Sequence, residues 1–316
     1  MKKEILLATL ATLFIAGCTQ QITNIFPQQI TFLGGTGLVM TDFSSDQTAV
    51  YGGQTNRIMM TVTNKGGHSV PDAESLVYLT GSALEPAGDD TIFWTTGDTL
   101  IRKFNTEMKP ADIVGDVPAT EKMITWSLVA PNISKGEQNN YLFIGRVYYD
   151  YQTKVTGNIW VYSQAEWDAA KAAGTTLNKA TWSASSGPVA INAYVTQDPV
   201  VLYDTEDSFT LIVKVGNGGG GVLYSDDTID YSTADPDDLA LTTDQINRVD
   251  IGVNLAGTDL TNECTGTQEL IGGKDITLSC DIVITPPATF QSFPITITAD
   301  YGYFTERTAS VVVTGR

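Results

Sequence analysis

Residues 143–151 read FIGRVYYDY, and residues 293–301 read FPITITADY. In both stretches the large apolar and aromatic side chains fall at alternate positions, beginning with Phe143 and Phe293. A side-chain period of two is typical of a β-strand with one buried face. Asp150 and Asp300 lie 150 residues apart near the ends of the two stretches. The sequence therefore predicts two copies of one strand.

The surrounding sequence repeats with nearly the same spacing. Residues 58–63 alternate and run into Asn64-Lys65-Gly66-Gly67, whereas residues 211–215 alternate and run into Gly216-Asn217-Gly218-Gly219. The two asparagines are 153 residues apart, and Trp126 and Leu278, within two further alternating runs, are 152 apart. Two short apolar runs, 159–161 and 311–313, also lie 152 residues apart. A near-constant shift indicates a tandem duplication.

Each copy has the length and strand content of an immunoglobulin-like (Ig-like) sandwich, about 100 residues or more with about seven strands. Val, Ile, Thr and Tyr enrichment and turn clusters between the runs favour antiparallel sheets with one buried face. We therefore expect an all-β protein with two tandem Ig-like antiparallel β-sandwiches, 37–162 and 188–316, each closed around its own core.

A short helix is expected between the two copies. Ser163-Gln164-Ala165-Glu166 has the spacing of a capping box, alanines continue to Ala173, and Gly174 ends the run. The linker then covers 163–187. Trp167 and Ala170 are placed to dock on the end of a sandwich.

The N-terminus resembles an export signal. Lys2 and Lys3 precede a short apolar run, and residues 1–17 end at Ala16-Gly17. Cys18 follows directly, as in the lipobox of prokaryotic lipoproteins, which predicts lipidation at Cys18 and a tether over 18–36. An ordinary cleaved signal with a chance cysteine is the alternative, and both place the protein outside the cytoplasm. The 18 residues after Cys18 reach roughly 60 Å at most.

The remaining cysteines, Cys264 and Cys280, can pair once Cys18 carries lipid. They are 16 residues apart, and a loop of that size stabilises by about 3 kcal/mol in the chain-entropy model. Such a bond persists only in an oxidising compartment. Two reduced thiols are the alternative.

The charge balance excludes one class of partner. The formal charge of −18 becomes −19 when the leader, with two Lys and one Glu, is removed. Nucleic acid and anionic lipid surfaces repel such a body. The acidic surface itself indicates no partner beyond cations.

The residues Cys18-Thr19-Gln20, the run 37–43, and the strand 58–63 with Asn64-Lys65-Gly66-Gly67 together resemble archaeal cell-surface lipoproteins with tandem CARDB-like or related Ig-like domains. The resemblance covers the first two strands of the first copy well and the second copy loosely. It implies a sandwich used for adhesion or for presenting other modules. It says little about activity, because sandwiches host many functions.

The chain carries little catalytic chemistry. Its one histidine, His68, lies in a glycine-rich loop beside Ser69, without a Gly-x-Ser-x-Gly motif. One His and two distant Cys do not make a zinc site. We therefore expect a protein that is not an enzyme and has no cofactor.

Two weaker site predictions remain. Closely spaced carboxylates suit Ca²⁺, although a solvated acidic loop is the alternative. The candidate calcium ligands are Asp226, Asp227, Asp230, Asp235, Asp237 and Asp238. The sequon Asn132-Ile133-Ser134 makes Asn132 a candidate for surface glycosylation.

Four hypotheses about function follow. The first is a non-catalytic structural or adhesive lipoprotein on the extracellular face of the cell membrane, with envelope proteins as partners. The second is a solute- or glycan-binding lipoprotein, with a site near Trp167 and Trp182. The third is a homo-oligomeric filament subunit that donates residues 22–32 as a strand. A hydrolase ranks last.

Overall fold

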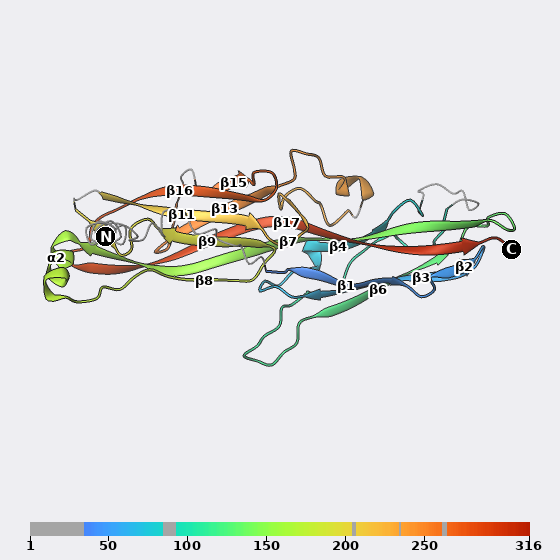
Figure 1. The fold of residues 1–316 in the computed structure, drawn as a ribbon, viewed down its shortest axis with the longest axis horizontal. Coiled ribbons are helices and arrows are strands. Elements are labelled where there is room, and N and C mark those ends of the chain that lie inside the picture. The colour runs from blue at the N-terminus through green and yellow to red at the C-terminus, as the bar shows by residue number, and fades with distance from the viewer. Residues whose placement is uncertain (1–34, 85–92, 204–206, 234, 261–263) are drawn as a thin grey trace, which may run out of the picture. The chain divides into compact units, whose positions relative to one another are not determined.

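The computed structural model describes residues 35–84, 93–203, 207–233, 235–260 and 264–316. Its two longest strands are β7 (Gln138–Ser163) and β17 (Phe290–Thr314), which pair antiparallel from Tyr162 opposite Phe290 to Gln138 opposite Thr314 (Figure 1). With 26 residues, β7 spans roughly 85 Å at about 3.3 Å per residue. This ladder organises the rest of the fold.

Within the described residues, nine shorter strands extend the β7–β17 sheet, and six others form two separate three-stranded sheets. The first small sheet has the order β1-β3-β6: β1 (Leu38–Ser45), β3 (Thr55–Asn64) and β6 (Glu121–Val129). The second has the order β16-β11-β9: β9 (Val189–Val195), β11 (Asp207–Asn217) and β16 (Asp275–Ile284). The large sheet adds β2 (Ala49–Tyr51), β4 (Ser75–Thr80), β5 (Ile101–Arg102), β8 (Thr181–Ala184), β10 (Val200–Leu202), β12 (Val222–Tyr224), β13 (Arg248–Leu255), β14 (Thr258–Asp259) and β15 (Gly266–Glu269). In the part of the chain that the structure describes, the helices are α2 (Gln164–Ala173) and two 3₁₀ turns, Asp72–Glu74 and Pro236–Leu239.

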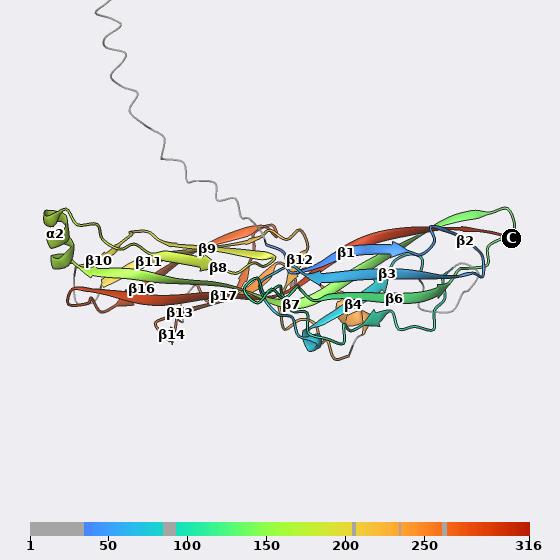
Figure 2. The ribbon, with the colours of Figure 1, turned by 90° about the horizontal axis from the view of Figure 1, so that it is seen from below.

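The two small sheets lie against different stretches of the long pair (Figure 2). In the first half, Gly145 of β7 leaves room for the sheet opposite, because a Cβ there would lie 2.6 Å from Met60 Cε and 2.7 Å from Phe43 Cε2. In the second half, Val213 of β11 and Ile297 of β17 are fully buried in the same hydrophobic cluster. Each half therefore has two facing layers, as the alternating pattern predicts.

The two halves exchange the far ends of their long strands. β2 of the first half pairs in parallel with the end of β17, with Ala49 opposite Val312, whereas β10 of the second half pairs with the end of β7, with Val200 opposite Val161. Each two-layered half is therefore completed by a strand that belongs mainly to the other half of the sequence.

This arrangement confirms a mostly-β protein built from antiparallel sheets. It corrects the expectation that each copy closes around its own core. One continuous hydrophobic cluster contains buried side chains from both copies, from Leu38 to Val313, and passes through the middle of the ladder at Tyr151 and Tyr301. The cores are shared because β7 and β17 run through both.

The reason for the difference lies in residues 152–158. The alternating pattern predicts separate strands at 143–151 and 159–161, but the strand continues through Thr153 and Val155, both buried. Thr and Val favour extended backbone. The turn-forming residue Gly157 is instead covered by Trp182 of β8, which pairs with this stretch.

The predicted helix is confirmed. Ser163 caps α2 by accepting a hydrogen bond from Glu166 N (3.3 Å), and Gly174 ends it with a left-handed φ of 69°. α2 contacts β7 and β10, and of the two residues expected to dock, Ala170 is buried whereas Trp167 is only partly buried. No helix among the described residues is long and apolar enough to cross a membrane.

Candidate functional site

The centre of the β7–β17 ladder carries four tyrosines on its inner face. Tyr149 lies opposite Tyr303 and Tyr151 opposite Tyr301, with ring centroids 5.9 and 6.1 Å apart. Tyr301 and Tyr303 are the counterparts of Tyr149 and Tyr151 in the repeat, each 152 residues later. Exchanging each tyrosine for its counterpart therefore reproduces the same two pairs of the ladder. The two halves therefore meet about an approximate two-fold axis at this point.

Two of the tyrosine hydroxyls bind the glycine-rich loops that follow the alternating runs 58–63 and 211–215. Tyr151 Oη accepts hydrogen bonds from Gly67 N (2.9 Å) and His68 N (3.0 Å). Tyr303 Oη accepts one from Gly221 N (2.6 Å) and donates to Asn217 Oδ1 (3.1 Å).

The asparagines of the two loops are also equivalent. Asn64 Nδ2 donates to His68 O (2.8 Å), and Asn217 Nδ2 donates to Gly221 O (3.0 Å). In each case the acceptor is four residues further along the chain. The Asn-x-Gly segments therefore form the same loop in both halves, fixed by a tyrosine at the ladder centre.

The hydrogen bonds also correct the alignment of the repeat. The spacing of 150 that matches Asp150 with Asp300 is shifted by two residues, because the tyrosines that hold the equivalent loops, Tyr151 and Tyr303, are 152 residues apart. A shift of two keeps every side chain on its own face, so the alternating pattern could not reveal it. The true counterpart of Asp150 is Gly302, directly opposite it in the ladder.

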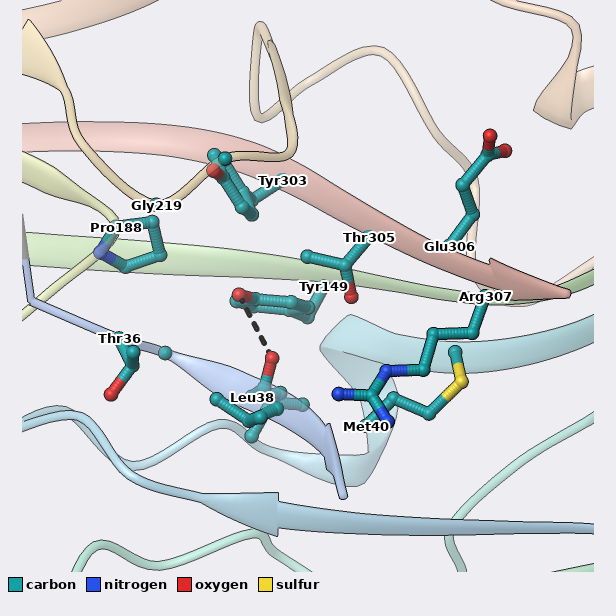
Figure 3. Close-up of a pocket in the computed structure, with 13 residues that line it drawn as sticks. Thr36, Leu38, Met40, Tyr149, Pro188, Gly219, Tyr303, Thr305, Glu306 and Arg307 are labelled. Atoms are coloured by element: carbon teal, nitrogen blue, oxygen red, sulfur yellow. Dashed lines mark hydrogen bonds between the residues drawn. The ribbon is translucent and has the colours of Figure 1, made fainter. Parts of the chain in front are cut away.

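A cavity of about 260 Å³ lies beside the tyrosines on the inner face (Figure 3). It is bounded by the start of β1, by Pro188 and Gly219, and by Tyr303 to Arg307 of β17. In Figure 3, Arg307 extends toward β1 whereas Glu306 points away from it, and Glu306 pairs with Arg146 (3.0 Å).

The side chains of this cavity cap the open edge of β1. Tyr149 Oη donates to Leu38 O (3.4 Å), and Arg307 Nη1 donates to Thr41 O (3.3 Å). β1 is the outermost strand of its sheet, so these carbonyl oxygens would otherwise face an added strand. The edge is therefore partly protected against pairing with another chain.

An acidic cavity of about 430 Å³ lies at the same level, beside the outward-facing Asp150. Its lining includes five carboxylates and the one histidine: Glu74, Asp150, Asp226, Asp227, Asp300 and His68. His68 packs edge-on against Tyr151, with ring centroids 5.3 Å apart.

Asp150 is the most unusual group of this cavity. Burial raises its pKa to about 8, the neighbouring Asp226, Glu74 and Asp227 add to the rise, and a hydrogen bond from Tyr231 Oη (2.8 Å) opposes it. Burial likewise raises the pKa of Asp226, with Asp300 as the next contribution. Asp150 is therefore mainly protonated at neutral pH.

The six predicted calcium ligands are not brought together. Asp226 and Asp227 line the acidic cavity. Asp230 accepts hydrogen bonds from Ser232, Asp235 caps the second 3₁₀ turn, of which Asp237 and Asp238 are members, and Asp238 accepts from Thr233. Within the described ranges no group of three or more His, Cys, Asp or Glu side chains is arranged to hold a metal ion.

The other predicted sites have different outcomes. Cys264 and Cys280 form a disulfide, with Cα atoms 5.6 Å apart, which confirms the pairing. Asn132 is exposed after β6, and its glycosylation stays a prediction. Cys18 and residues 22–32 lie outside the described residues. Trp167 lines a cavity beside α2, and Trp182 does not share it.

The roles of Asp150 and of the four tyrosines were not predicted from the sequence. A signal was present, since tyrosines at 149 and 151 recur at 301 and 303, 152 residues later. The burial of Asp150 carries no such signal, because it depends on Tyr231 from a segment that the first half lacks.

Comparisons with known proteins assign no family. No family model matches the chain, and no curated protein matches it. Among solved structures, the secreted serine protease VesC from Vibrio cholerae has 6% identity and a TM-score of 0.19, over 85% of this chain and 50% of its own. The red sea bream transglutaminase has 10% identity and a TM-score of 0.20, over 87% and 31%. The chain thus spans about half or less of these proteins, and TM-scores this low inform neither fold nor function.

Proposed function

We propose that this chain is a non-catalytic, lipid-anchored cell-surface protein with a structural or adhesive role. The observation that carries the proposal is the β7–β17 ladder, in which 25 residues of β17 pair with β7 without interruption. A ladder of this length joins both halves into one body, a property that suits a spacer or a support for partner proteins. In this proposal each half descends from an Ig-like sandwich that has exchanged its last strand.

The path of the chain supports anchoring near the ladder centre. Thr36 Oγ1 donates to Lys65 O (3.1 Å), and Gly37 lies against Tyr149 and Pro188. The described chain thus begins beside the central tyrosines. A tether from Cys18 would hold the body there and leave the distal ends of both halves to meet neighbouring envelope proteins.

The disulfide supports an extracytoplasmic location. Cys264 and Cys280 are both buried, and disulfides persist mainly in oxidising compartments. The buried aromatic side chains support the non-catalytic reading, because Tyr149, Tyr151, Tyr301 and Tyr303 are occupied in packing and loop hydrogen bonds. Such side chains stiffen the body and cannot themselves stack on a glycan.

The test combines anchoring with partner capture on intact cells. Wild-type chain and the Cys18→Ala variant are expressed with a proximity-labelling tag and compared by detergent partition, surface proteolysis and mass spectrometry. We expect the wild type to partition with detergent, to be cleaved from outside, and to label a few envelope proteins, and the variant to be released. Equal partition of both forms would contradict the anchor. Labelling dominated by a transporter would favour solute delivery instead.

A further inference from the structure

A hairpin over residues 109–120 projects from the body just before β6 (Figure 1). Thr120 N donates to Lys109 O (2.9 Å), and Asp112 and Val117 exchange two backbone hydrogen bonds of 2.9 and 3.0 Å. At its tip, Asp112 Oδ1 accepts from Val114 N and Gly115 N, both at 3.0 Å. The tip is therefore fixed by its own hydrogen bonds.

This fixed tip presents two branched aliphatic side chains to solvent. Ile113 is 93% exposed and Val114 is 99% exposed, and the carboxylates of Asp112 and Asp116 on either side are exposed as well. Single exposed apolar residues are ordinary. Two adjacent ones on a preorganised tip form a compact surface suited to insertion into an apolar cavity.

A cavity of matching chemistry lies beside α2. Its volume is about 370 Å³, within the range of about 300–1,000 Å³ typical of ligand clefts. Trp167, Leu177 and Pro199 supply its apolar lining, and Lys171 and Lys179 stand on it as exposed cations.

The walls of this cavity are held in place by hydrogen bonds. Thr175 N donates to Ala170 O (2.9 Å) and Asn178 N to Tyr162 Oη (3.0 Å). Asp198, the one carboxylate in the lining, accepts from Ala180 N (2.8 Å). The cavity is therefore preorganised, as the hairpin tip is, so little ordering is lost when the two meet.

We propose that the hairpin tip of one copy inserts into the α2 cavity of a second copy, with Asp112 and Asp116 facing Lys171 and Lys179. Charge complementarity argues for a second copy as the occupant. A body with 36 acidic and 18 basic residues repels another copy over most of its surface. Two copies therefore attract each other electrostatically only where lysines of one meet carboxylates of the other. An anionic membrane would repel the same tip. Because hairpin and cavity are different surfaces, the contact is head-to-tail and builds rings or open chains.

The test uses the mature chain from residue 18 with Cys18→Ser, followed by sedimentation velocity over rising concentration. We expect reversible association that weakens at least tenfold in Val114→Asp and in the double variant Lys171→Glu, Lys179→Glu. Ile271→Asp is the matched control, since Ile271 is 76% exposed at a turn in the other half, and we expect it to associate like the parent. A chain that stays monomeric throughout would overturn the proposal, and so would equal weakening by Ile271→Asp.

Cysteine pairing gives a second measurement, which reports which residues come into contact in the complex. Val114→Cys and Leu177→Cys are placed on separate chains and mixed under mild oxidation, with Ile271→Cys replacing Val114→Cys as the control. We expect a disulfide-linked dimer from the first mixture at a rate at least tenfold above the control. Equal rates would overturn the proposed contact.

Discussion

The inner and outer faces of the ladder centre differ in how well the two halves match. On the inner face, Tyr151 and Tyr303 hold the same loop in each half through the same kind of hydrogen bond. On the outer face, Asp150 in one half stands where the other has Gly302. The shared contacts are those that fix the fold, whereas the unmatched pair lies where the halves have diverged.

The divergence has an identifiable origin in the second half. The segment between β12 and β13 brings Tyr231 onto Asp150, and β12 itself places Tyr224 against Gly302. The two tyrosine hydroxyls are hydrogen-bonded to each other at 2.8 Å. In the first half β4 begins at Ser75, directly after the 3₁₀ turn, without a comparable insertion.

The largest expected loss of stability comes from a substitution on the outer face, at Gly302. A Cβ at this position would collide with the ring of Tyr224, and overpacking of this kind costs about 3 kcal/mol. We expect Gly302→Ala to lower the free energy of unfolding by that amount in urea titrations. Gly97→Ala is the control, because a Cβ there meets nothing within 4 Å. Equal stability of the two variants would contradict the packing described.

The next effect concerns the proton on Asp150. Its pKa is raised to about 8 in the folded chain, so the stability contributed by the proton is present below the unfolded pKa near 4 and is lost as pH rises through about 8. We expect the free energy of unfolding of the wild type to fall by about 2–3 kcal/mol more between pH 6 and pH 9 than that of Asp150→Asn. The asparagine keeps an acceptor for Tyr231. Urea unfolding at both pH values measures this, and parallel pH dependence in the two proteins would refute it.

A smaller loss of stability tests whether the tyrosine–loop hydrogen bonds of the inner face are equivalent in the two halves. Tyr151→Phe leaves His68 N without its acceptor, whereas Gly67 N keeps Ser186 O (2.8 Å), and Tyr303→Phe leaves Gly221 N and Asn217 Oδ1 unpaired. We expect each variant to lose about 1–2 kcal/mol, with similar values in the two halves. Tyr203→Phe, at a 61% exposed side chain, should change stability by less than about 0.5 kcal/mol. A loss confined to one half would show that the loops are not equivalent.

Much of the fold is predictable from local patterns. Alternation identified the strands, the Ser163 cap and Gly174 bounded the helix, and two remaining cysteines gave the disulfide. Strand exchange was not predictable, because period-two alternation in Thr153 and Val155 is the same whether a strand continues or a new one begins. The acidic cavity was out of reach for a related reason: Asp150 meets Tyr231 only through long-range pairing, which no spacing in the sequence records.

The central claim is that neither half closes a core without the long strand of the other. Scanning calorimetry of residues 35–187 alone tests it most directly, because this fragment keeps β7 but lacks β17. We expect the fragment alone to show no cooperative unfolding transition. A cooperative transition should appear when residues 188–316 are added as a second fragment. A cooperative transition of the isolated fragment within a few degrees of the full chain would show two independent sandwiches and contradict the account.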